Sequence, residues 1–254
     1  MGNTLCPGQD TRFWRPGDIF EVNCQSCGNS IEFFKDEATR RCRKCGARVT
    51  NPRFSLGCAQ WCEHAKECLG YDPKEAAEKD EAAESMVDRL IADMKSVFGK
   101  DQKRIEHALT VLEHARALLG QEEVEPKVVM AAAVLHDIGI KEAERKHGSA
   151  AGAYQEMEGP PIAERIMKEA GLDQDTIEHV SHIVGSHHRG NDIDTPEFRI
   201  VWDADFLVNL PEEHPDLSGA ELEEKIEKLM RTEAGKARAV DMFLSKHETP
   251  AGQD

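Results

Sequence analysis

Apolar side chains recur at helical spacing over most of the chain beyond residue 72. The clearest run predicts an amphipathic helix with one buried face and contains Met86, Leu90, Ile91, Met94, Val97 and Phe98. Asp72 and Pro73 fit the start of this helix, because aspartate caps helix N-termini and proline suits the first turn. Gly99 follows the last apolar residue and fits the helix end.

The same periodicity predicts further helices, which glycine and proline separate. We expect them over residues 101–119, 126–139, 160–170, about 173–186, from 196 through 207, and 218–246. Pro160 and Pro161 are expected to start one of them, and Ser218 with Glu221 predicts a capping box at the start of the last. Residues 141–158 are polar and mostly non-periodic, which predicts a loop or short helices.

The first 70 residues follow a different pattern. Residues 30–35 alternate roughly between apolar and polar positions, and residues 48–50 form a second short segment that reads as a strand. All eight cysteines lie within the first 68 residues. We therefore expect a mainly α protein, with a small β-rich, cysteine-rich domain over 1–71 and an all-helical domain over 72–254.

Four of the cysteines form two CxxC-Gly turns separated by fourteen residues: Cys24, Cys27, Cys42 and Cys45. In such a turn successive amides face a thiolate, and the glycine supplies the positive φ that closes it. The arrangement resembles a zinc ribbon, with four thiolates holding one structural zinc ion. Four free thiols are the alternative, but a unit this small has little apolar core without a metal.

The other four cysteines, Cys6, Cys58, Cys62 and Cys68, match no standard zinc-finger spacing. Cys58 and Cys62 are four residues apart and can share a helical face. Cys6 precedes a proline, as some iron–sulfur ligands do. We expect the four to converge on one second metal centre, either zinc or an iron–sulfur cluster. Buried small apolar residues are the alternative.

The formal net charge of −16 disfavours nucleic acid as a main partner, because phosphate backbones attract basic surfaces. An acidic surface is also repelled by anionic membranes. Residues 1–10 have no apolar stretch, and no apolar run approaches the length of a membrane span. We therefore expect a soluble, cytoplasmic protein with no membrane partner.

A histidine and an aspartate stand side by side at the end of the most apolar predicted helix. Residues 128–135 are all apolar, His136 and Asp137 follow, and Gly139 comes just past the helix end. Buried charge is tolerated when it is paired or coordinates a metal. Imidazole and carboxylate groups both bind divalent cations. A capping aspartate beside a hydrogen-bonded core histidine is the alternative.

Five segments in this order resemble the HD-domain superfamily of metal-dependent phosphohydrolases. They are IEHAL (105–109), AVLHDIG (133–139), GPPIAERIM (159–167), IVGSHH (183–188) and WDADFL (202–207), so the resemblance covers roughly residues 100–210. It implies a helical domain with one divalent metal, for which Mn, Mg, Fe, Co, Ni and Zn all stay open. The ligands that it implies are His107, His136, Asp137 and Asp205.

The resemblance also implies roles for neighbouring residues. His187 or His188 matches the histidine that many members use for a second metal or for substrate phosphate, and Lys141 can join them in stabilising negative charge. Asp137 is placed to accept a proton from water. Asp203 is expected to hold a ligand histidine in its tautomer, whereas His114 is expected to be a satisfied interior or surface histidine.

The sequence departs from the family pattern in several places. Dinuclear members carry another histidine a few residues before the glycine that matches Gly159, but residues 155–158 contain none, although Glu158 can ligate. Two fully occupied metals are therefore in question. The Gly-Tyr-Pro that follows paired histidines in the cyclic-dinucleotide-cleaving branch is absent, which disfavours cyclic di-GMP.

The resemblance implies hydrolysis of a small phosphorylated substrate, a nucleotide or another small phosphoester, by metal-activated water. A diiron oxygenase of the HD type is one alternative and needs the missing ligand. A non-catalytic ligand or redox sensor is the other, with the cysteine-rich domain binding a protein partner.

Overall fold

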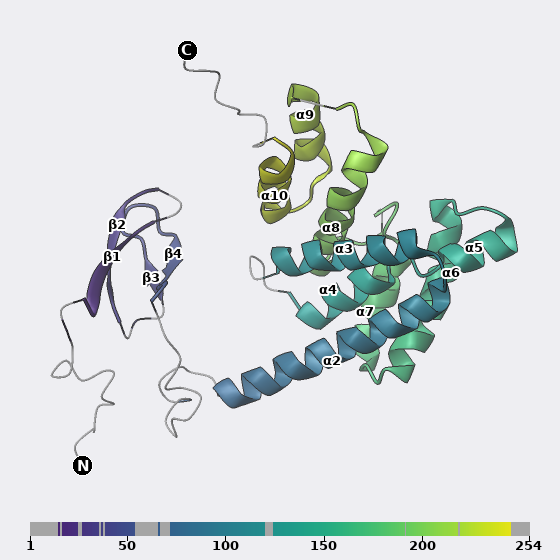
Figure 1. Cartoon of the computed structure of the whole chain (residues 1–254), viewed down its shortest axis with the longest axis horizontal. Helices are drawn as coiled ribbons and strands as arrows, with labels where there is room; N and C mark the ends of the chain where they lie inside the picture. Colours follow the sequence, from purple (N-terminus) through teal and green to yellow (C-terminus); the bar gives the residue numbers. More distant parts are fainter. Residues whose placement is uncertain are drawn as a thin grey trace. The chain divides into compact units, whose positions relative to one another are not determined.

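The computed structural model of the chain (Figure 1) describes residues 15, 17–24, 27–35, 37, 39–53, 66, 72–119, 124–190, 192–217 and 219–244. The chain divides into two compact units, 1–78 and 79–254. Cys6, Cys58, Cys62 and Cys68 lie outside the described residues, and so does Ser218 of the predicted capping box.

The first unit holds two small antiparallel sheets. Strand β1 (Ile19–Asn23) pairs with β2 (Ser30–Phe34), and β3 (Thr39–Arg41) pairs with β4 (Arg48–Thr50). Its core contains Ile31, Phe33 and Val49 together with Cys24 and Cys42. The strands predicted at 30–35 and 48–50 are present, and their partners β1 and β3 were not predicted.

The rest of the described chain is helical, which confirms the prediction of a mainly α fold. The helices are α2 (Pro73–Phe98), α3 (Gln102–Leu118), α4 (Pro126–Leu135), α5 (Ile140–His147), α6 (Gly152–Glu169), α7 (Gln174–Val184), α8 (Pro196–Glu213), α9 (Gly219–Leu229) and α10 (Glu233–Phe243). As predicted, α2 starts at Pro73, and Gly99 at its end adopts a positive φ of 62°.

Helix α4 is the centre of the helical unit. All of its residues from Val128 to Leu135 are buried, and it packs against α3, α7 and α8. A helix that is apolar on every side has to be surrounded by other elements, and this one is. Its end therefore delivers His136 and Asp137 to a point where three other helices meet.

Two predictions about helix boundaries are wrong. Pro160 and Pro161 lie inside α6 rather than at its start, because α6 packs against both α5 and α7 and this packing outweighs two missing backbone donors. In residues 141–158, predicted to be a loop or short helices, the structure has the short helix α5 and the beginning of α6. The helix predicted over 218–246 is two helices, because Asp203 accepts the backbone N–H groups of Arg231 and Thr232 where the chain turns.

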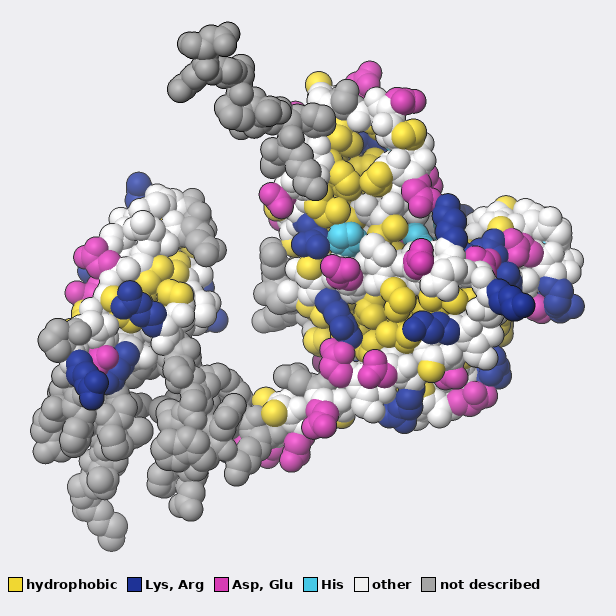
Figure 2. Space-filling view, in the orientation of Figure 1, with side chains coloured by type: hydrophobic (Ala, Val, Ile, Leu, Met, Phe, Trp, Pro, Cys, Tyr) yellow, Lys and Arg dark blue, Asp and Glu magenta, His cyan; other side chains and the backbone are white. Residues whose placement is uncertain are grey.

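No helix among the described residues has the length and apolar character that crossing a membrane requires. In the space-filling view of Figure 2, histidine side chains reach the surface of the helical unit, and charged side chains of both signs surround them.

Candidate metal centre

Four histidines and two aspartates from four helix regions meet at the end of α4. His107 lies on α3 and Asp205 on α8, and both face His136, the C-cap residue of α4. The Nε2 atoms of His107 and His136 are 3.2 Å apart, and Asp205 Oδ1 lies 3.0 Å from His107 Nε2 and 3.5 Å from His136 Nε2. His107, His136 and Asp205 thus form one group with three ligand atoms facing a common point.

A second group lies directly beside the first. Asp137, His187 and His188 each offer a ligand atom within 4.8 Å of the others. Asp137 faces both groups: its Oδ2 lies 3.6 Å from His107 Nε2 and 3.5 Å from His136 Nε2, whereas its Oδ1 lies 3.4 Å from His187 Nε2. The carboxylate of Asp137 therefore stands between the two groups and can serve both.

The orientation of two histidines is fixed by their own helices. His136 Nδ1 lies 2.9 Å from the Ala133 carbonyl oxygen, and His187 Nδ1 lies 2.8 Å from that of Val184. A carbonyl oxygen only accepts, so each Nδ1 carries a proton and Nε2 is the ring nitrogen that can offer a lone pair to a metal once it is unprotonated. This is the tautomer in which a histidine binds a metal through Nε2.

Close packing at two glycines brings His107 and His136 next to His187 and His188. A Cβ at Gly139 would lie 2.5 Å from the Gln155 carbonyl oxygen and 2.7 Å from the Gly159 nitrogen. A Cβ at Gly159 would in turn lie 2.7 Å from Val184 Cγ1. The ends of α4 and α7 are therefore held against the middle of α6 at positions where only glycine fits.

We expect Gly139→Ala to lower the free energy of unfolding of the helical unit by about 1–3 kcal/mol or more, the usual cost of overpacking. Both atoms that the new methyl group meets belong to the backbone, so no side chain can move aside. Gly171→Ala is the control, because a Cβ there meets nothing within 4 Å and only the positive φ of 82° opposes it. Chemical denaturation measures both, and equal losses would contradict the packing argument.

The carboxylates set the protonation of the centre. Burial opposes a charge on His136, but Asp137 and Asp205 outweigh it and raise the pKa of His136 to about 9. Burial likewise opposes the charge on Asp137, yet His136 and His187 lower its pKa to about 2. Without a metal, the ring of His136 therefore carries a second proton, on Nε2, at neutral pH, and the neighbouring aspartates are ionised.

We expect metal affinity to rise about tenfold for each pH unit between pH 6 and 8, because one proton must leave His136 when a metal binds. The raised pKa also stabilises the metal-free fold below about pH 6.5, and this contribution is lost as the pH rises through 9. Calorimetric titration of Mn²⁺ at several pH values measures the slope. A pH-independent affinity would contradict the assignment of the proton.

The donor set fits a divalent metal. His187 Nε2 is buried and makes no hydrogen bond within the described part of the chain, although it lies in a cluster of ligand atoms. An orphaned acceptor of this kind is costly unless something else satisfies it. The 3.2 Å between the His107 and His136 nitrogens also suits two ligands that bind one ion at about 2.0–2.1 Å each.

Lys141 lies four residues beyond Asp137, at the rim of this region. Its Nζ pairs with Asp101 Oδ2 at 3.2 Å, and the same carboxylate oxygen receives Arg104 Nη1 at 2.8 Å. The second guanidinium nitrogen of Arg104 binds Glu144 at 2.6 Å. The structure therefore places the ammonium group of Lys141 against Asp101 and not against the histidines.

Two further expectations from the sequence do not match the structure. Asp203 does not hold a ligand histidine: it is fully buried and accepts hydrogen bonds from Arg231 and Thr232, which ties α8 to the start of α10. Glu158 is not with the ligand groups, because its carboxylate binds Lys146 at 2.6 Å and His147 at 2.9 Å.

His114 is a satisfied interior histidine, as expected, and its Nδ1 accepts a hydrogen bond from Arg238 Nε at 3.1 Å.

Two residues near the cluster were not predicted. Asn209 donates to Asp205 Oδ1 at 2.9 Å, and its position four residues later on α8 is the spacing from which this contact could have been inferred. Glu156 accepts backbone N–H groups from the turn that carries His188. The sequence carries no signal for this second contact, because it joins residues that are 32 positions apart.

The four cysteines of the two CxxC turns form a separate cluster in the first unit. Cys24, Cys27, Cys42 and Cys45 offer sulfur atoms that all lie within 4.8 Å of one another. Two of the sulfur–sulfur distances are 3.6 Å, close to the edge of about 3.8 Å in a tetrahedron with 2.3 Å zinc–sulfur bonds. The backbone N–H groups of Cys45 and Lys44 lower the pKa of Cys42 to about 6, which favours a thiolate.

Residues 104–210 match the family model of the HD domain. Among solved structures, the chain is similar to a predicted HD superfamily hydrolase from an uncultured Thermotogales bacterium, with 22% sequence identity, coverage of 60% of this chain and 82% of that chain, and a TM-score of 0.44. A comparison with curated proteins found no match. The matched range contains every residue of the histidine and aspartate cluster: His107, His136, Asp137, His187, His188 and Asp205.

Proposed function

We propose that the chain is a metal-dependent phosphohydrolase acting on a nucleotide or another small phosphoester, because residues 104–210 match the family model of the HD domain, as the sequence resemblance led us to expect. The observation that carries this proposal is the position of Asp137 between two groups of ligands. A bridging carboxylate beside open ligand positions is suited to hold water next to a bound phosphate.

His107, His136 and Asp205 would hold the first metal with Asp137, and Asp137, His187 and His188 would hold a second. A divalent ion there lowers the pKa of bound water and neutralises charge on the phosphoryl group. The side chains of His107, Asp137 and Asp205 are 15–20% exposed, so water and substrate reach the centre from their side, whereas His136 is 1% exposed and closes the opposite side.

The residues of the chain have distinct roles in this proposal. Asp137 is ionised over the physiological range and can therefore accept a hydrogen bond from water and orient it. Desolvation by burial and the neighbouring His187 lower the pKa of His188 to about 4. His188 is thus neutral at pH 7, which suits a ligand or a hydrogen-bond donor to phosphate rather than a positive charge.

A panel of nucleotides, phosphomonoesters and pyrophosphates, assayed with protein loaded with Mn²⁺ or Fe²⁺, tests the function. We expect metal-dependent phosphate release from at least one member of the panel. Binding without turnover would favour the sensor. Oxygen consumption by the iron-loaded protein without phosphate release would favour the oxygenase.

For the cysteine-rich unit we propose a structural zinc ion at Cys24, Cys27, Cys42 and Cys45, supported by the sulfur–sulfur distances. The thiolates fill all four positions of a tetrahedral ion, which leaves none for a substrate. This is the coordination of a structural site rather than a catalytic one.

We further propose that this unit binds an acidic protein segment. Residues 39–53 hold six basic residues and no acidic one. Arg41, Arg43, Lys44 and Arg48 are exposed, and no ion pair with any described residue neutralises them. A surface of unpaired cations attracts an anionic partner.

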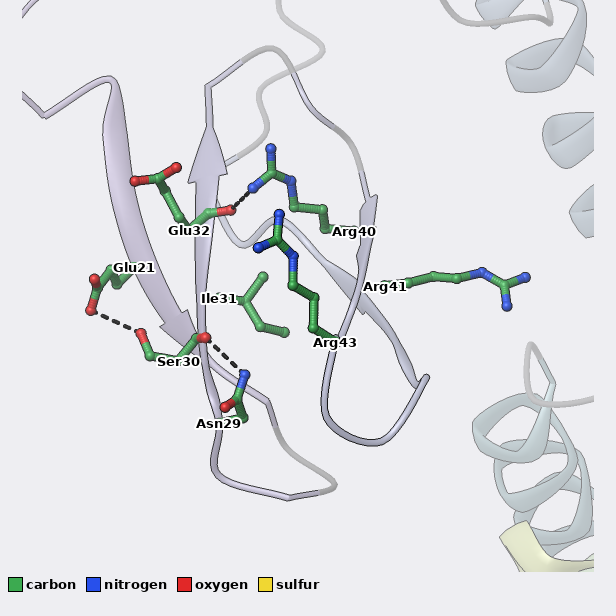
Figure 3. A pocket seen from close by; sticks show the side chains of 8 residues that line it. All are labelled: Glu21, Asn29, Ser30, Ile31, Glu32, Arg40, Arg41 and Arg43. Carbon is green, nitrogen blue, oxygen red and sulfur yellow. Dashed lines mark hydrogen bonds between the residues drawn. The ribbon is translucent and has the colours of Figure 1, made fainter.

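The shape of this surface favours a polypeptide over nucleic acid. A cavity of about 490 Å³ lies between β2 and β3, and Arg40 and Arg43 line it together with Glu21 and Glu32 (Figure 3). The rings of Phe20 and Phe34 are covered by Arg53 and Arg40, so they are not open for base stacking. Binding of an octaglutamate peptide to the wild-type chain, and weaker binding to the Arg43→Glu variant, would support the proposal. Binding of an oligonucleotide but not of the peptide would contradict it.

A further inference from the structure

Helix α6 contacts the turn after α7 at two points that lie four residues apart. The first is Gly152, where a Cβ would lie 2.8 Å from Cγ and Cδ2 of His188. The second is Glu156, which reaches the backbone of the same turn. Residues four apart share one face of a helix. A single face of α6 therefore packs against the ring of His188 and binds its backbone.

Glu156 is buried more completely than a single carboxylate usually is. Its side chain is 1% exposed, and a buried charge needs hydrogen bonds to compensate its lost hydration. Oε1 accepts the backbone N–H groups of His188 and Arg189, both at 3.1 Å, and Oε2 accepts Arg189 Nε at 2.5 Å. Since the Arg189 side chain is 63% exposed, the carboxylate's inward-facing partners are the two N–H groups of the turn.

The two histidines of this turn depend on Glu156 to different degrees. His187 is oriented by its own helix, through the hydrogen bond to the Val184 carbonyl oxygen. The ring of His188 makes no hydrogen bond to any residue that the structure describes, and it packs against His187 with ring centroids 4.0 Å apart. The position of the His188 ring therefore depends on the hydrogen bonds from the backbone of the turn to Glu156 and on the absence of a side chain at Gly152.

We propose that Glu156 is a positioning residue that holds His188 as the third ligand beside Asp137 and His187. The inference rests on the proposed function, because it assigns His188 to the second metal of that site. No histidine occurs in residues 155–158 of α6, so this helix contributes to the second metal through the backbone of the turn rather than through a ligand of its own. Partners that orient ligands in this way change metal affinity by about 10–100-fold.

Calorimetric titration of the full chain with Mn²⁺ tests the proposal, because this ion prefers carboxylate and imidazole over thiolate ligands. We expect the wild-type chain to bind two Mn²⁺ ions at the helical unit. Glu156→Leu should weaken only the second binding event, by about 10–100-fold. Glu156→Gln retains an oxygen that can accept both N–H groups, and should therefore restore most of the affinity.

Glu158→Leu is the matched control, because Glu158 is a neighbouring buried carboxylate of α6 that binds Lys146 and His147 instead of the turn. If Glu156→Leu does not fold, Gly152→Ala provides the same test by displacing the ring of His188. A lower melting temperature with an unchanged Mn²⁺ profile would overturn the proposal, and so would a wild-type chain that binds one Mn²⁺. A wild-type chain that binds none would instead overturn the proposed function.

Discussion

His136→Ala is expected to abolish metal binding by the histidine and aspartate cluster and to lower kcat/KM for the substrate by about 10³-fold or more, beyond the usual loss for a single electrostatic group. His136 is the most deeply buried ligand, and its Nε2 lies within 3.5 Å of His107, Asp137 and Asp205. Its removal leaves the two aspartates facing each other without the group that balances their charge. Metal analysis after dialysis and steady-state kinetics measure the two effects.

His114→Ala is the matched control, because it removes a second buried histidine from the same core. His114 interacts with Arg238 and takes no part in the cluster, so we expect its loss to cost stability but to leave metal content unchanged. Circular dichroism of both variants separates unfolding from loss of the site. Full metal content in His136→Ala, or metal loss in His114→Ala, would show that the ligands are assigned to the wrong residues.

The helices that the sequence predicted well are those whose start and end depend on neighbouring residues. Pro73 starts α2, Pro196 starts α8, and Asp173 caps α7 by accepting the Thr176 N–H. Such signals act within a few residues, so they can be recognised in the sequence without knowledge of the tertiary contacts. Pro160 and Pro161 carry the same local signal, but α5 and α7 pack on both sides of α6 and extend the helix through them.

The order of ligands along the chain could be inferred because each stands in a short motif on its own helix. What the sequence could not show is how the motifs are held together. Gly139 and Gly159 permit backbones far apart in the sequence to touch, and Asp203 binds a turn 28 residues away. Such contacts depend on the three-dimensional packing of helices and leave no periodic pattern in the sequence.

The second prediction with a large expected effect concerns the cysteine-rich unit. Cys42→Ser is expected to unfold this unit while the helical unit keeps its melting transition and its Mn²⁺ binding. The apolar core of the first unit consists of Ile31, Phe33 and Val49, with smaller contributions around them, and Cys42 is itself buried within it. So few side chains bury too little surface to offset the chain entropy lost on folding.

The missing stability would come from the metal, because zinc binding to four ligands in small domains supplies about 10–16 kcal/mol of apparent free energy. Chelation of zinc from the wild-type chain should therefore produce the same loss of dispersed amide signals as Cys42→Ser, and zinc added back should restore only the wild type. The helical unit shares none of these cysteines and has its own core around α4, so its amide signals should not move. A folded cysteine-rich unit after complete zinc removal would show that its small sheets are stable alone, and loss of the helical signals would show that the two units do not fold independently.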